Sequence, residues 1–164
     1  FGMELTGVFE NQELKLGIIK KSDFLRIGRF NLFELDGNGF ISSGVDNENT
    51  GYIDNAYYIG EFVEGRLTGY GHYNTKDDLQ KYYGEFVNFS KSGFGSEINF
   101  ANDPFEFHGI FKDNEFHGYG LLYAVASNGE LETITGFYQN GEYIHDDKDL
   151  VYDNWSNEFN KRHK

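Results

Sequence analysis

Residues 57–73 read Tyr-Tyr-Ile-Gly-Glu-Phe-Val-Glu-Gly-Arg-Leu-Thr-Gly-Tyr-Gly-His-Tyr. A leading glycine, Gly60, is followed two positions later by an aromatic residue, Phe62. Two trailing glycines, Gly69 and Gly71, stand nine and eleven positions after the lead. Since side chains alternate between the two faces of a strand, this spacing is typical of two strands joined by a turn near residues 64–68.

The same spacing recurs through most of the chain. All copies have the leading glycine and the aromatic residue, and four of the six also have both trailing glycines. Successive leads lie 21 to 32 residues apart, a period typical of repeat arrays. The six copies are led by Gly7, Gly28, Gly60, Gly84, Gly109 and Gly136.

Each copy predicts a β-hairpin. Glycine inside a strand marks a place where another group approaches the backbone closely. We therefore expect Gly69 and Gly71 to leave space for the ring of Phe62 on the neighbouring strand. A single hairpin is marginally stable in water, so the hairpins must stack. The predicted fold is all-β: an elongated, twisted, single-layer antiparallel sheet of about six hairpins, with a short C-terminal helix.

The predicted array covers residues 1–148, and residues 149–164 form a C-terminal amphipathic helix or tail. Val151, Trp155 and Phe159 follow a helical i, i+4, i+8 stripe. This helix either covers the sheet or docks on another protein or a second copy of the chain. An acidic, glycine-containing insertion at about residues 42–55 is expected to be a solvated loop or a lengthened hairpin.

Composition restricts the class of function. The net charge is −13, which disfavours binding to nucleic acid or anionic lipid and favours a basic or apolar partner. The chain has no cysteine, and therefore neither a disulfide framework nor a thiolate metal site. The first residues, Phe-Gly-Met, suggest a fragment of a longer protein. The expected location is cytoplasmic, with association to cytoskeleton or membrane only through partners.

Motifs for catalysis, metals and cofactors give no positive signal. Residues 36–42 resemble part of a calcium loop, but Val45 stands where a bidentate glutamate is needed. A weaker cation site could use residues 46–54. Three histidines lie near acidic residues without metal-ligand spacing, and no nucleophile elbow, phosphate loop or dinucleotide fingerprint is present. We expect no enzyme activity, no cofactor and no metal.

The Tyr-x-Gly-x-Phe…Gly-x-Gly copies resemble MORN (membrane occupation and recognition nexus) repeats over roughly residues 5–145. The resemblance implies an elongated sheet of hairpins without catalytic residues, used as a scaffold, a dimerisation module or a partner-binding surface. It also implies two alternatives, a phospholipid-targeting module and an accessory domain of a larger enzyme. The chain departs from the pattern where a turn glycine is expected, because Phe33, Phe89 and Asn114 stand there.

A single-layer sheet cannot bury both faces, and a large exposed apolar surface marks an interaction site. We therefore expect a non-catalytic scaffold that binds an amphipathic helix, a basic peptide or a second copy of itself along an aromatic groove. Each ring also has a structural interpretation, as a core side chain. The predicted contact residues are Phe30, Tyr58, Phe62, Tyr82, Phe86, Phe107, Phe111 and Trp155.

Overall fold

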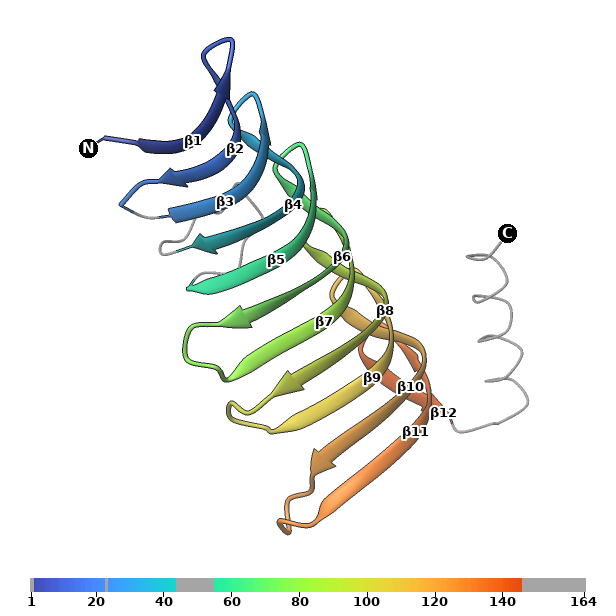
Figure 1. The fold of residues 1–164 in the computed structure, drawn as a ribbon. Helices are drawn as coiled ribbons and strands as arrows, with labels where there is room; N and C mark the ends of the chain where they lie inside the picture. The colour runs from blue at the N-terminus through green and yellow to red at the C-terminus, as the bar shows by residue number, and fades with distance from the viewer. Residues whose placement is uncertain (1, 23, 44–54, 146–164) are drawn as a thin grey trace, which may run out of the picture.

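The computed structural model describes residues 2–22, 24–43 and 55–145, and these form one open antiparallel sheet of twelve strands in chain order (Figure 1). This confirms the all-β prediction. The described ranges contain no helix, and so none that could cross a membrane. The predicted helix at 149–164, with Trp155, and the insertion at 44–54 lie outside the described residues. The strands are β1 (Glu4–Glu10), β2 (Glu13–Lys20), β3 (Phe24–Asn31), β4 (Glu34–Ser43), β5 (Ala56–Val63), β6 (Arg66–Thr75), β7 (Gln80–Val87), β8 (Ser90–Asn99), β9 (Phe105–Lys112), β10 (Glu115–Val125), β11 (Leu131–Gln139) and β12 (Glu142–His145).

A row of paired glycines crosses the sheet. Gly60 on β5 pairs with Gly71 within its hairpin and with Gly39 on the preceding hairpin. Because the same pairing holds from β1 to β11, the leading glycines and one glycine on the second strand of each of the first five hairpins form a continuous line. The row consists of Gly7, Gly17, Gly28, Gly39, Gly60, Gly71, Gly84, Gly95, Gly109, Gly120 and Gly136.

The other trailing glycine has a different role, at a bulge. In the third hairpin only Glu61 separates the paired positions of β5, whereas residues 68–70 separate those of β6. Gly69 lies in this bulge with φ of 98°, a conformation that glycine adopts without the steric cost of a Cβ. The first hairpin has a single extra residue, Lys15, and therefore pairs Gly7 with Gly17. Sequence spacing overlooked Gly17 for this reason.

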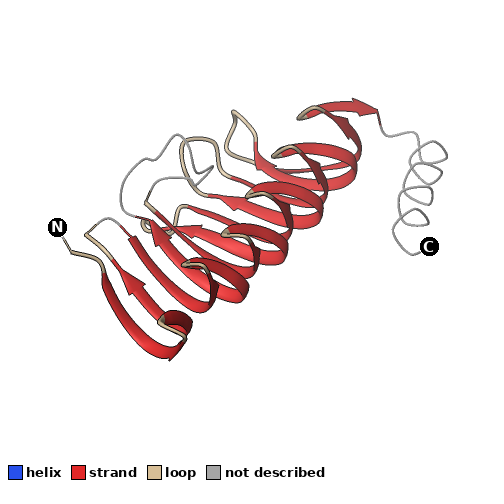
Figure 2. Ribbon diagram, turned by 90° about the horizontal axis from the view of Figure 1, so that it is seen from above, coloured by secondary structure: helices blue, strands red, loops and turns tan. Residues whose placement is uncertain are grey.

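The strands are strongly bent (Figure 2), and ring distances show that the aromatic side chains lie inside the bend. Tyr82 and Phe86 are four residues apart on β7, yet their ring centroids are 4.9 Å apart. The equivalent rings of Phe107 and Phe111 on β9 are 5.2 Å apart. Since the Cα atoms of such residues would be about 13 Å apart along a straight strand, the strand must curve toward the ring-bearing face. A single sheet thereby encloses its own core.

The space above the glycines is filled by other side chains than we expected. The sequence hypothesis assigned it to the aromatic residue two positions after the lead, such as Phe62. Instead, a Cβ on Gly120 would overlap the ring of Phe107, which stands two positions before the leading glycine of the same hairpin, Gly109. In the third hairpin, Leu67 lies over Gly71. The bend explains why a different side chain covers the glycines, because it tilts the ring of the residue two positions before the leading glycine across the pair of glycines.

The hairpin turns consist of two residues with positive φ, the geometry of type I′ turns. The second turn residue also donates its N–H to the preceding hairpin: Phe89 N bonds Leu67 O at 2.9 Å. Phe89 is buried, and its ring meets those of Tyr58 and Phe62 at centroid distances of 5.4 and 6.3 Å. The turn therefore tolerates a bulky residue at a strained position, because the ring of that residue packs against the preceding hairpin.

This difference between turns predicts opposite effects of glycine at two positions. Phe33 (φ 69°) is exposed, whereas Phe89 (φ 66°) is buried. Phe33→Gly is expected to stabilise the protein by up to about 1 kcal/mol, since it relieves left-handed strain. Phe89→Gly is expected to cost about 2–3 kcal/mol, because the lost ring outweighs the relieved strain. Urea denaturation of both variants measures the difference, and a stabilised Phe89→Gly protein would contradict it.

Candidate protein-binding face

The seven described residues that we expected to contact a partner are core residues. Their side chains form one hydrophobic cluster with only 0–4% of each residue exposed. A partner resting on the folded sheet therefore cannot contact these rings, and the structural interpretation applies to each. The eighth, Trp155, lies outside the described residues. The seven are Phe30, Tyr58, Phe62, Tyr82, Phe86, Phe107 and Phe111.

The core of the fourth hairpin contains an ion pair. Lys91 Nζ lies 2.5 Å from Glu97 Oε1, and both residues are 8% exposed. The ammonium also lies 5.7 and 5.6 Å from the ring centroids of Tyr82 and Phe111. Burial, followed by the charge of Glu97, raises the pKa of Tyr73 far above its ordinary value. Because both charged groups are enclosed by rings, this pair belongs to the core and offers no accessible reactive group.

The outer, convex face carries a second row of apolar side chains, parallel to the glycine row. Each member stands next to a row glycine, so its side chain points away from the core. Ile18, Ile27, Ile59 and Tyr83 are 37–49% exposed, and the other two members are half-buried. Register pairs join them across six consecutive strands, β2 to β7. We call this the outer row: Ile18, Ile27, Phe40, Ile59, His72 and Tyr83.

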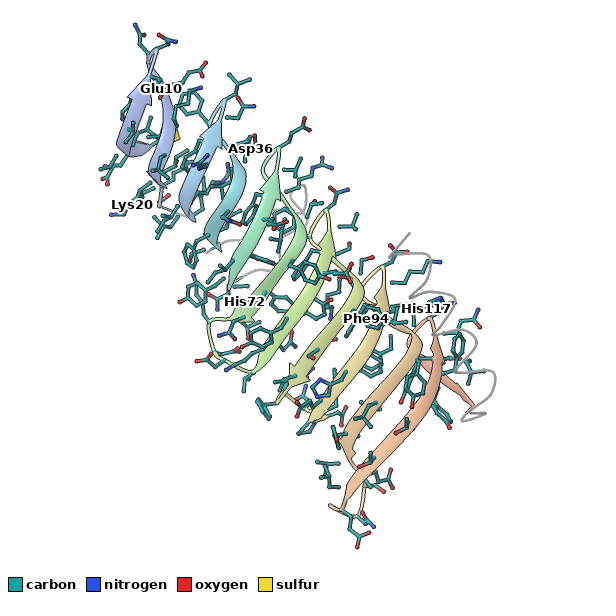
Figure 3. The ribbon with its side chains drawn as sticks, turned by 45° about the vertical axis from the view of Figure 1, so that its right-hand side comes forward. Glu10, Lys20, Asp36, His72, Phe94 and His117 are labelled. Atoms are coloured by element: carbon teal, nitrogen blue, oxygen red, sulfur yellow. The ribbon has the colours of Figure 1, made fainter. Side chains whose placement is uncertain are left out.

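Ring contacts reinforce the outer row, which includes His72 on β6 (labelled in Figure 3). The imidazole of His72 lies 5.2 Å from the ring of Tyr83, and the ring of Phe40 stacks on Tyr57 at 5.9 Å. Burial lowers the pKa of His72 below its ordinary value. Burial therefore favours the neutral form of this imidazole within an otherwise apolar and aromatic row.

The outer row ends at a polar group on β8 and β9. Ser96 Oγ lies 2.7 Å from His108 Nδ1, and His108 Nε2 lies 2.8 Å from Glu106 Oε1. This order of hydroxyl, imidazole and carboxylate resembles that of an activated nucleophile. However, Ser96 lies within a continuous ladder with Tyr83 and His108 on either side. The neighbouring backbone N–H groups are engaged in that ladder, so the local geometry supplies no oxyanion site.

The spacing of apolar residues around the leading glycines also indicates the outer row, although the predicted contact residues were chosen from the aromatic rings of the other face. Ile27, Ile59 and Tyr83 each stand one position before a leading glycine, and Phe40 and His72 stand twelve positions after one. Strand alternation assigns these positions to the face opposite the rings. What sequence could not reveal was that the ring-bearing face encloses itself and leaves this other face as the accessible one.

The chain matches no protein-family model, and a search of curated proteins finds no match. Among the described residues, no three histidine or carboxylate side chains are close enough together to hold a metal ion. Residues 36–42, which resembled a calcium loop, lie within strand β4. The functional argument therefore rests on the geometry of the outer face.

Proposed function

We propose that this chain is a non-catalytic scaffold built from MORN-type hairpins, which binds another protein through the outer row. The observation that carries the proposal is the row itself, six side chains side by side on consecutive strands, of which four are exposed and two are half-buried. Contiguous exposed apolar surface on a soluble domain is costly and marks interaction sites. On this proposal the chain works in the cytoplasm, and reaches cytoskeleton or membrane through its partners.

The stacked architecture supports a scaffold role. Each strand pairs only with its neighbours in the chain, so the array is a quasi-linear support with a regular outer surface. The buried rings hold the bend, and the bend presents the outer row along a convex ridge. Core and contact surface are therefore separate, and the contact residues can be changed without removing the core.

A double substitution on the row tests the proposal. Ile27→Glu with Ile59→Glu places two charges in the middle of the apolar surface. The control is Val63→Glu with Val87→Glu, which alters two equally exposed residues near the hairpin tips. Because all four side chains are exposed, each substitution is expected to change the free energy of unfolding by less than about 0.5 kcal/mol.

The measurement is affinity capture with quantitative mass spectrometry on the wild-type chain and both variants. We expect proteins captured by the wild type and the tip control to be lost with the row variant. If the row variant captures the same proteins as the wild type, the outer row is not the contact surface and the proposed function is wrong.

A further inference from the structure

The length of the outer row matches that of a short helix. Six strands at about 4.8 Å spacing place β2 and β7 roughly 24 Å apart. An α-helix of about 16 residues has this length. A helix lying along the row would bring an apolar stripe over every member from Ile18 to Tyr83.

The face also favours a helix over an extended segment. Backbone N–H and C=O groups beneath the outer row are already paired in the ladders on both sides of each strand. An extended peptide laid on this face would therefore bury its own backbone groups without partners, which costs free energy. A helix satisfies its backbone internally and presents only side chains.

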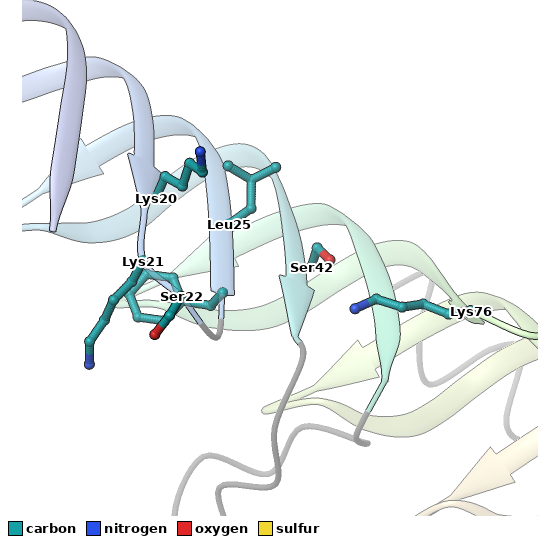
Figure 4. A pocket seen from close by; sticks show the side chains of 7 residues that line it. Lys20, Lys21, Ser22, Leu25, Ser42 and Lys76 are labelled. Atoms are coloured by element: carbon teal, nitrogen blue, oxygen red, sulfur yellow. The ribbon is translucent and has the colours of Figure 1, made fainter. Parts of the chain in front are cut away.

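Cations border the row on one side. A hollow of about 220 Å³ lies at the loop ends of β2, β3 and β4 (Figure 4), where Lys20 and Leu25 stand two residues along their strands from Ile18 and Ile27. Its lining includes three lysines and two apolar residues: Lys20, Lys21, Lys76, Phe24 and Leu25.

Among the residues that the structure describes, Lys20 and Lys76 are only weakly neutralised by carboxylates. Lys20 Nζ is 3.8 Å from a Glu4 carboxylate that is itself 75% exposed. Lys76 makes no ion pair with any of the residues that the structure describes, and its ammonium lies 5.8 Å from the ring centroid of Tyr57. A local cationic border therefore exists on a chain of net charge −13.

The opposite border of the row has mixed charge. Glu61 and Glu85 lie on the outer face on the other side of the row, toward the hairpin tips, and Arg29 occupies the equivalent position on β3. A ligand with carboxylates on both borders would be repelled there. The lysines of the hollow therefore define which side of a bound helix must be acidic.

We propose that the partner of the outer row is an amphipathic helix of about four turns whose apolar stripe is bordered by carboxylates on the side facing the lysine hollow. This inference rests on the proposed function, and replaces the basic peptide expected from the net charge of the whole chain. The local border decides the partner's charge, because charges separated by more than a Debye length of about 8–10 Å are largely screened.

Two synthetic 16-residue helical peptides test the inference, and fluorescence anisotropy measures their binding to the full chain. They share a leucine stripe and a glutamine border, and their other border carries either glutamates or lysines. The glutamate peptide is expected to bind about tenfold more tightly at low salt, since it can form two or three surface ion pairs with the lysines of the hollow. The preference should weaken in 0.5 M NaCl.

The variant Lys20→Glu with Lys76→Glu supplies the charge swap. It is expected to reverse the preference so that the lysine peptide binds more tightly, a gain that a misfolded protein cannot produce. Equal binding of the two peptides to the wild-type chain, or no binding, would refute the acidic helix. If the peptides fail in this way but Ile27→Glu with Ile59→Glu still abolishes the capture of partner proteins, the acidic helix is refuted and the scaffold proposal is not.

Two other occupants give different results. Sedimentation of the wild-type chain with vesicles containing anionic lipid, if abolished by Lys20→Glu with Lys76→Glu, would assign the hollow to a membrane and overturn the proposal. A concentration-dependent dimer in sedimentation velocity, if lost in Ile27→Glu with Ile59→Glu, would assign the row to a second copy and also overturn it.

Discussion

Gly120→Ala is expected to destabilise the protein by about 2–3 kcal/mol, because the new methyl group has no space. A Cβ at this position would overlap the ring of Phe107, which is completely buried. That ring stacks on Phe116 at 3.9 Å and meets Tyr138 edge-on at 5.2 Å. It can move only by disturbing the rings around it. Urea denaturation monitored by circular dichroism measures the loss.

A double-mutant cycle identifies the cause. Phe107→Leu alone is expected to cost about 1–2 kcal/mol through lost packing. Combined with Gly120→Ala, it should cost at least about 1 kcal/mol less than the sum of the two single changes, since the methyl group then occupies space that the ring has left. Gly2→Ala is the control, because nothing lies within 4 Å of its Cβ position. Strict additivity in the cycle would show that the glycine row serves some purpose other than making room for this ring.

Glu97→Ala is expected to cost about 3–5 kcal/mol, since it leaves the ammonium of Lys91 buried without its carboxylate. Both partners have only 8% of their surface exposed. The surrounding rings of Tyr82 and Phe111 interact with the cation but cannot neutralise its charge. The free energy of unfolding from urea titration at pH 7 tests this value. Glu132→Ala, at an exposed position on β11, is the control and should change it by less than about 0.5 kcal/mol.

The repeat itself supplies the matched double variant. In the second hairpin, Leu35 and Ile41 occupy the positions of Lys91 and Glu97, and both are fully buried. Lys91→Leu with Glu97→Ile installs that apolar pair, and is expected to be neutral or to stabilise the protein by up to about 2 kcal/mol. A double variant as unstable as Glu97→Ala would mean that the fourth hairpin needs the ion pair for its geometry.

Local spacing allowed much of the fold to be predicted. Gly60, Phe62 and Gly71 predicted a hairpin, and the recurrence of this pattern predicted an antiparallel all-β array in chain order. These features depend on residues close together in the chain, where turn length and strand alternation determine pairing. The assignment to MORN repeats, the C-terminal helix and the partner remain predictions.

The candidate site was not predictable in the same way. The rings of residues such as Phe86 were expected at a contact surface, but they are buried because the strands bend around them. The bulges also differ between hairpins, with one extra residue in the first and two in the third, so the pairing of Gly7 with Gly17 could not be read from the spacing of the third hairpin.

Sequence by itself determined that this chain forms successive hairpins with a line of glycines and one ring-bearing face. Only the tertiary structure decided that this face encloses its own core and that the outer row remains accessible. The physical reason is that curvature results from many side chains packing across strands, and no single repeat contains that information.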